Sequence, residues 1–264
     1  MSPNATLYAA LVLYSIGTLL ALGTLFAHDR RTQLAALGIM IGGFVCHTIW
    51  IGGICVRTGH PPLTNLPEAS AFTAWTVFAV ELALFVRYRV HAASFFVYPL
   101  VLMLSTVAAV VHEPFVRMDP SLRSGLFTTH VFLSTVGVAA LFIGLAFTML
   151  AFVQDRALKS KRRGPLWDWI PSLELCAKLS YRATAIGFSI YTLGLLAGIV
   201  WNYRVNAELM DMRVKQVGAL VAWLLFAVLL QSFLRGAFRA RRTLVISIGA
   251  FVATLVAILG IQHV

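Results

Sequence analysis

Long apolar stretches, separated by short polar or basic connections, run through almost the whole chain. A helix needs about 20 apolar residues to cross a bilayer core, and eight stretches are long enough. Their predicted ranges are 7–27, 33–56, 69–86, 92–111, 125–153, 178–201, 216–234 and 243–262. No internal repeat or low-complexity linker interrupts the pattern. It predicts an all-α, polytopic integral membrane protein in which residues 1–264 form a single transmembrane domain, an eight-helix bundle in the lipid bilayer.

Basic residues gather in alternate connections. The loops after spans one, three, five and seven hold most of them, within 30–31, 87–89, 156–163 and 235–242. Loops rich in Lys and Arg stay on the cytoplasmic side of a membrane. Both termini are therefore predicted to lie outside, in a multi-pass protein of the bacterial inner (cytoplasmic) membrane.

Composition supports the membrane prediction and excludes other classes. Hydrophobic residues make up 59% of the chain and charged residues only 12%, whereas a soluble domain has about 25% charged residues. The net charge of +11 does not indicate nucleic-acid binding, because topology accounts for the basic loops and no basic helix carries groove-reading polar residues. Cys46, Cys55 and Cys176 form no CxxC pair, so the sequence predicts neither a redox motif nor a zinc site.

Histidines at the ends of spans are the first candidates for chemistry. His130 lies about one and a half turns into span five, His263 ends span eight, and His112 follows span four. All three are predicted at the outer face. Imidazole is a common ligand of haem iron, so His130 and His263 could hold iron. The alternative is that they hydrogen-bond water or backbone at the interface.

Polar side chains inside spans are the second group of candidates. His47 lies in span two, and burial requires that it either bind a ligand or form a structural hydrogen bond. Glu81 in span three and Gln231 in span seven are also predicted to be buried, where interhelical hydrogen bonding is the simplest role. No GxSxG, HExxH or Walker sequence is present, which argues against a catalyst with its own active site.

Four stretches together resemble one family. They are 58–75 (TGHPPLTNLPEASAFTAW), 124–142 (SGLFTTHVFLSTVGVAALF), 171–201 (PSLELCAKLSYRATAIGFSIYTLGLLAGIVW) and 218–264. In this order they resemble the CcsA, HemX and YpjD group of cytochrome c assembly proteins. The resemblance implies a protein that presents haem at the outer membrane face, held by two external histidines, here His130 and His263, and delivers it to apocytochrome c.

The resemblance also shows where this chain departs from CcsA proteins. Their tryptophan-rich WWD loop reads roughly WGxxWxWDPK, and the corresponding positions here are Asn206, Met210, Met212, Arg213 and Lys215. Only the lysine matches, so the WWD motif is degenerate. Gln231 stands where CcsA has an intramembrane histidine. Residues 44–49 (FVCHTI), with His47, look more like the HemX and YpjD branch.

Two functions follow from these observations. The first is haem binding or haem handling by His130 and His263, with Met210 or Met212 as a possible thioether ligand, although interfacial packing is the commoner role of Met. The second is a haem-free, HemX-like scaffold or regulator. Its basic loop 154–164 would dock a cytoplasmic enzyme such as glutamyl-tRNA reductase, and its other partners would be another cytochrome c assembly subunit or a respiratory complex.

Overall fold

The computed structural model describes residues 4–27, 29–63, 65–111, 124–160, 170–207, 214–235 and 239–259. Within these ranges the chain forms helices and no strand, which confirms the all-α prediction. The helices are α1 (Ala5–Ala27), α2 (Arg30–Thr58), α3 (Leu66–Tyr88), α4 (Ser94–Val110), α5 (Gly125–Ser160), α6 (Leu173–Asn206), α7 (Val214–Leu234) and α8 (Ala240–Leu259).

Seven of these helices are long and apolar enough to cross a membrane, and the multi-pass prediction is confirmed. The remaining one, α4, is apolar but has 17 residues, fewer than the 92–111 predicted for it. It ends at Val110 because the next residue, Val111, turns to extended backbone with ψ 112°.

Local sequence signals explain several helix ends. Asp29 begins α2 by accepting hydrogen bonds from the backbone N–H groups of Arg31 and Thr32, both at 3.0 Å. Gly59 ends α2 with φ 75°, a left-handed conformation that glycine adopts without steric cost. Asn65 begins α3 by accepting from the backbone N–H of Glu68 at 2.9 Å. These caps satisfy backbone groups that a helix leaves without partners.

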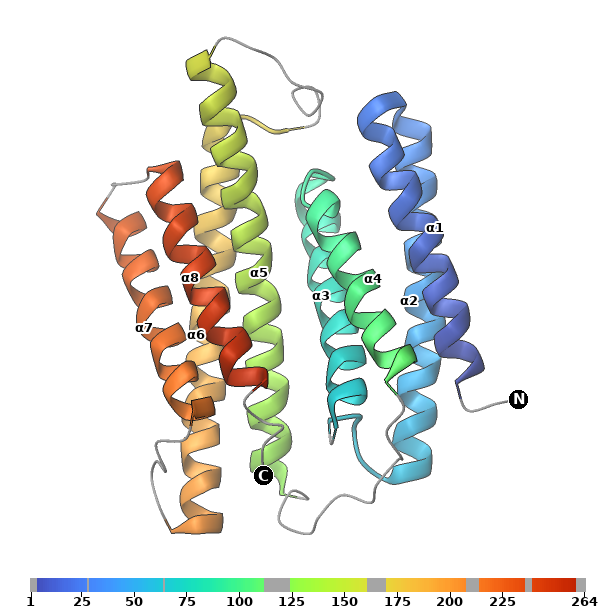
Figure 1. The fold of residues 1–264 in the computed structure, drawn as a ribbon, viewed down its shortest axis with the longest axis vertical. Coiled ribbons are helices and arrows are strands. Elements are labelled where there is room, and N and C mark those ends of the chain that lie inside the picture. Colours follow the sequence, from blue (N-terminus) through green and yellow to red (C-terminus); the bar gives the residue numbers. More distant parts are fainter. Residues whose placement is uncertain are drawn as a thin grey trace. The chain divides into compact units, whose positions relative to one another are not determined.

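The chain divides into two compact units of four helices, although the sequence pattern alone indicates one domain. Unit 1 contains α1 to α4, and unit 2 contains α5 to α8. In each unit every helix packs on the next one in the chain, and the first also packs on the fourth. Within each unit, consecutive helices run in opposite directions (Figure 1). Each unit is therefore an up-and-down four-helix arrangement with short connections.

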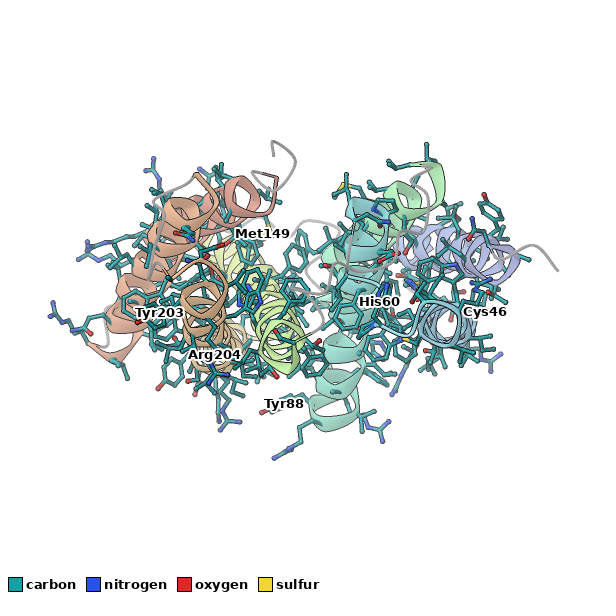
Figure 2. All side chains as sticks on the ribbon, turned by 90° about the horizontal axis from the view of Figure 1, so that it is seen from below. Cys46, His60, Tyr88, Met149, Tyr203 and Arg204 are labelled. Atoms are coloured by element: carbon teal, nitrogen blue, oxygen red, sulfur yellow. The ribbon has the colours of Figure 1, made fainter. Side chains whose placement is uncertain are left out.

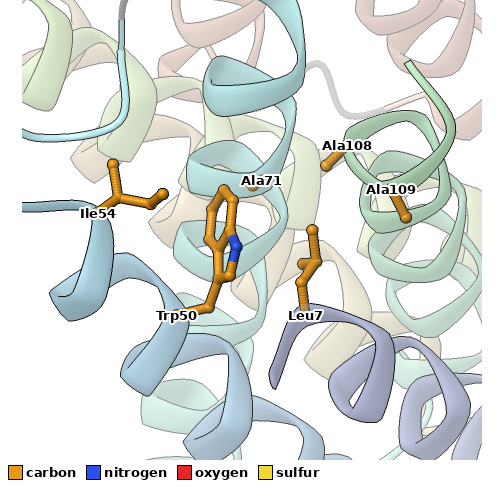
Figure 3. Packing of buried hydrophobic residues seen from close by; sticks show 6 residues of the cluster. All are labelled: Leu7, Trp50, Ile54, Ala71, Ala108 and Ala109. Carbon is orange, nitrogen blue, oxygen red and sulfur yellow. The ribbon is translucent and has the colours of Figure 1, made fainter. Parts of the chain in front are cut away.

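The interior of unit 1 combines aromatic, small and polar side chains. Tyr14, Phe78 and His47 are fully buried, and Glu81 is 3% exposed. Toward the end where α1 begins, one apolar cluster joins all four helices (Figure 3). It consists of Leu7, Trp50, Ile54, Ala71, Ala108 and Ala109. The predicted burial of His47 and Glu81 is thus confirmed.

Unit 2 has an apolar interior built on α5, α6, α7 and α8. Its buried cluster consists of Leu141, Tyr191, Ala222, Phe226, Leu229 and Ala250. Hydroxyl side chains are buried in this unit as well, among them Thr148, Ser180 and Thr184, whereas Tyr203 and Arg204 near the end of α6 are exposed (Figure 2). The buried carboxyl and imidazole groups of the described residues all lie in unit 1, on Glu68, Glu81, His47 and His60.

Candidate functional site

The contact between α5 and α6 places His130. Facing residues pair at intervals of three and four along both antiparallel helices, a heptad spacing typical of a left-handed coiled coil. The pairs are Phe127 with Trp201, His130 with Gly198, Ser134 with Gly194, Gly137 with Tyr191, Leu141 with Gly187, Gly144 with Thr184, and Thr148 with Ser180. We call this contact the α5/α6 seam.

Glycines allow the two backbones of the seam to approach closely. A Cβ atom added at Gly137 would lie 2.6 Å from the backbone N of Tyr191, and one added at Gly187 would lie 2.8 Å from the backbone N of Leu141. No side chain fits at such distances, so only glycine is accommodated. Close approach through small residues is a common way for helices to associate in membranes.

His130 is held in this seam by the backbone of α6. Its Nδ1 atom lies 2.7 Å from the carbonyl oxygen of Gly194, and the Ser134 hydroxyl lies 3.5 Å from the same nitrogen. Gly198 lies against the ring, since a Cβ there would be 2.5 Å from Nδ1. The absence of a side chain at Gly198 thus creates the space that the imidazole fills, and Gly194 likewise leaves room for Ser134.

The hydrogen bond to Gly194 determines the tautomer of His130. A carbonyl oxygen only accepts hydrogen bonds, so Nδ1 must carry the proton. In the neutral ring Nε2 then has the lone pair, and no described residue hydrogen-bonds it. The imidazole is only partly buried. Histidines that bind metals usually donate their other N–H to a carbonyl or carboxylate in this way.

An aromatic pair lies next to His130 on the seam. The rings of Phe127 and Trp201 are 5.1 Å apart and inclined by 54°. They are one step beyond the pair formed by His130 and Gly198, toward the start of α5. The seam thus places two aromatic rings one step from the imidazole of His130.

His47 has different surroundings in unit 1. Its Nδ1 atom lies 3.3 Å from the hydroxyl of Tyr14, and its ring makes edge contacts with Tyr14 and Trp50. The side chain is fully buried. These contacts support the structural hydrogen bond, which is one of the two alternatives that the sequence leaves open.

The other predicted site residues are placed as follows. His263, Met210 and Met212 lie outside the described residues. Gln231 is exposed, so its predicted burial is wrong. It lies in the last turn of α7, next to Arg235, where a long polar side chain can extend away from the helices. In the described ranges no three His, Cys, Asp or Glu side chains gather to hold a metal ion.

Comparison with known proteins places this chain in a family. Residues 63–264 match the model of the cytochrome c assembly protein family, which is more than half of the chain. The chain belongs to the cytochrome c assembly protein family. Similar members are Protein HemX of Brevibacillus brevis, 26% identical over 79% of this chain and 75% of the relative, and the cytochrome c biogenesis protein CcsA of Mesostigma viride, 24% identical over 90% and 86%.

Among solved structures, the cytochrome c haem lyase CcmF has a similar fold. The TM-score is 0.77 and the identity 18%, and the match covers 97% of this chain but only 46% of CcmF. At this identity the likeness concerns the fold alone. The family membership and the fold both agree with the resemblance drawn from the sequence motifs.

Proposed function

We propose that this member of the cytochrome c assembly family handles haem, and that Nε2 of His130 would be one of the atoms that hold the iron. The observation that carries the proposal is the hydrogen bond of 2.7 Å from Nδ1 to the carbonyl of Gly194. It keeps the ligating nitrogen unprotonated without using a charged group. The haem would supply the iron chemistry, and the chain would bind, orient and release it.

The residues around His130 fit a porphyrin. Phe127 and Trp201 offer aromatic surface beside the imidazole, and such surface stabilises a flat apolar ring system. Part of the aromatic platform that the degenerate WWD loop lacks is thus supplied by the helices themselves. We propose His263 as the second ligand, because the family resemblance pairs it with His130.

The position of His130 along α5 supports presentation of haem at the outer face. The residue lies five positions after Gly125, or about 8 Å along the helix. The opposite end of α5 carries Arg156 and Lys159, and basic ends face the cytoplasm. The same rule places both termini outside. A reporter enzyme fused to the C-terminus tests this topology, and activity of the reporter in the cytoplasm would contradict it.

A spectrum of the purified protein tests the haem proposal. We expect a Soret band after expression with excess haem, confirmed by a pyridine haemochrome assay. His130→Ala and His263→Ala should each shift or abolish the band. His91→Ala, in the connection between α3 and α4, should leave it unchanged. Added imidazole should restore the band of His130→Ala, because it replaces the missing ligand. Wild type without a band, or an unaltered band in both variants, would refute the proposal.

A haem-free scaffold is the second candidate function. The specific observation in its favour is the loss of the WWD aromatics at Asn206, Met210 and Met212. The sequence predicts the basic segment 154–164 as a loop, but its residues 154–160 form the end of α5. In a scaffold this segment would dock a cytoplasmic enzyme, a further assembly subunit or a respiratory complex. Neutralising three of its basic residues should then abolish co-purification of that partner while insertion stays intact. Unchanged co-purification, together with a haem spectrum, would eliminate the scaffold.

A further inference from the structure

Each helix of unit 1 buries, away from its ends, a polar side chain that has an atom without a hydrogen-bond partner among the described residues. The four atoms are Thr18 Oγ1 on α1, His47 Nε2 on α2, Glu81 Oε2 on α3 and Ser105 Oγ on α4. None of these side chains is more than 3% exposed. Gln33 Nε2 and His60 Nε2 are further such atoms in this unit, near the two ends of α2. Buried polar groups are almost always hydrogen-bonded, to water if not to protein. Four such atoms in one unit therefore need a common explanation.

Aromatic contacts show that these side chains face a shared interior. Phe78 of α3 contacts Tyr14 of α1, with ring centroids 6.2 Å apart, and Tyr98 of α4, at 6.0 Å. The hydroxyl of Tyr14 reaches His47, and Glu81 is close enough to Tyr98 to interact with it electrostatically. Thr18 follows Tyr14 by four residues on α1, and Ser105 follows Tyr98 by seven on α4, so each lies on the same face of its helix as that tyrosine.

These groups form a column along the unit. We measure depth along each helix from its own basic end, at which α1 and α3 end and α2 and α4 begin. At 1.5 Å per residue, Glu81 lies about 10 Å deep, Thr18 about 14 Å and Ser105 about 16 Å. Tyr14 follows at about 20 Å and His47 at about 25 Å. Groups on different helices are also separated laterally, and bound water can join polar groups that lie beyond direct hydrogen-bonding distance.

The far end of the column is closed. Beyond His47 lies the apolar cluster around Trp50, Leu7 and Ile54 described above (Figure 3). The indole N–H of Trp50 is engaged with Asn4 at 3.3 Å. An indole donates but does not accept, so it does not relay a proton. The column therefore communicates only with the basic end, which carries Asp29, Arg30, Arg31, Arg87, Arg89 and His91.

We propose that unit 1 encloses a blind-ended hydrated well, in which bound water and one exchangeable proton on Glu81 join that carboxyl to the Tyr14–His47 pair. An ionised carboxylate in an apolar interior costs many kcal/mol unless it is paired. No described basic side chain forms an ion pair with Glu81, so a proton neutralises it. Water satisfies the remaining atoms. Because the well has one open end, it takes up and releases protons on that side without leaking them across the membrane.

Infrared difference spectroscopy of the full chain in lipid vesicles tests the well. Near neutral pH, wild type should show the C=O band of a protonated carboxylic acid, which Glu81→Gln removes. In D₂O the band should move to lower frequency within minutes, because water reaches the group. Ser105→Ala, which removes one hydroxyl, should shift the band, and so should Tyr14→Phe. Thr76→Val is the matched control on α3, since its buried hydroxyl already donates to the carbonyl of Phe72.

Each alternative outcome overturns the proposal. If Glu81 gives no such band, the carboxyl carries no proton. If the band appears but does not respond to D₂O within hours, the interior is dry. If the frequency of the band is unchanged in both Ser105→Ala and Tyr14→Phe, no water chain connects the groups. A band that disappears when sodium is added means that the site binds a monovalent cation instead. None of these results depends on whether the protein binds haem.

Discussion

The first hairpins of the two units, α1/α2 and α5/α6, are both antiparallel helix pairs with glycine contacts and one histidine each. In unit 1 His47 is fully buried, and its partner is the phenol of Tyr14. In unit 2 His130 is only partly buried, and its partner is the backbone carbonyl of Gly194. A phenol can donate or accept and so leaves the imidazole tautomer open, whereas a carbonyl fixes it. Only the second arrangement defines which imidazole nitrogen carries the proton.

The glycines of the two hairpins differ in what they face. A Cβ at Gly17 in α1 would meet the flexible side chain of Met40 at 2.7 Å, and one at Gly43 would meet the ring of Tyr14. In the α5/α6 seam, Gly137 and Gly187 face backbone atoms. A side chain can move aside, but the backbone of a packed helix cannot. The α5/α6 seam should therefore tolerate a side chain at these glycines less well than the α1/α2 contact does.

The largest effect on stability is expected when these glycines are replaced by alanine. Gly137→Ala should destabilise the protein by about 3 kcal/mol, because the new methyl group would overlap the backbone of Tyr191. Gly17→Ala should cost about 1 kcal/mol or less, since Met40 can change rotamer and alanine favours the helix. Equilibrium unfolding in mixed detergent micelles measures both. Equal losses would show that the two hairpins are equally tolerant.

A smaller effect is expected from removing the buried histidine. His47→Ala should lower stability by about 2 kcal/mol, because it leaves a cavity and deprives Tyr14 of its partner. Haem binding should persist. His130→Ala should do the reverse, with loss of the Soret band and a stability change below about 1 kcal/mol at this partly exposed position. Unfolding curves and haem spectra of both variants measure these effects. A large loss of stability in His130→Ala, together with a lost Soret band in His47→Ala, would contradict the prediction.

The contact between the His130 ring and Gly198 gives a test with a smaller expected effect. Gly198→Ala should weaken haem binding about tenfold, equivalent to about 1.4 kcal/mol, because its Cβ would lie 2.5 Å from Nδ1 and push the ring away from Gly194. Gly125→Ala is the matched control in the same hairpin, since nothing lies within 4 Å of its Cβ. Titration with haem measures the affinity. If both variants bind like wild type, Gly198 does not position the histidine.

Much of this architecture can be predicted from the sequence, because apolar length and charged connections are local signals. The spans and the burial of His47 and Glu81 follow from the position along a helix. The last residue of α4 cannot be predicted in this way, because it depends on the backbone conformation at Val111. The predicted burial of Gln231 was wrong for a related reason. Residue type and position along the chain do not tell which side of α7 a residue occupies.

The site itself depends on contacts between helices, which no local pattern specifies. Neither the hydrogen bond to Gly194 nor the contact of the His130 ring with Gly198 is visible until α5 and α6 are paired in register. One signal could have found the pairing. Gly137 and Gly144 are seven residues apart on α5, and Gly187 and Gly194 are seven apart on α6, the period of a helical seam with small residues.

The smallest expected effect compares the helix caps of the two units. Asp29 begins α2 in unit 1, and Ser172 begins α6 in unit 2 by accepting from the backbone N–H of Leu175 at 3.3 Å. The Thr32 hydroxyl donates to Asp29 at 2.6 Å. This bond, helped by the backbone N–H groups of Arg31 and Thr32, lowers the pKa of the Asp29 carboxyl below its usual 3.8. The folded state thus prefers the ionised carboxylate.

The sign of the pH dependence follows from this lowered pKa. The stability that Asp29 contributes is present above pH 3.8, its ordinary value, and is lost as the pH falls through the lower folded-state pKa. Asp29→Ala should therefore be less stable than wild type at pH 7, and the difference should shrink below about pH 4. Ser172→Ala should cost about 1 kcal/mol at both pH values, because its hydroxyl does not titrate. Unfolding free energies of the two variants at pH 7 and pH 3 measure this contrast. A penalty for Asp29→Ala that is the same at both values would mean that the carboxylate charge contributes nothing to the cap.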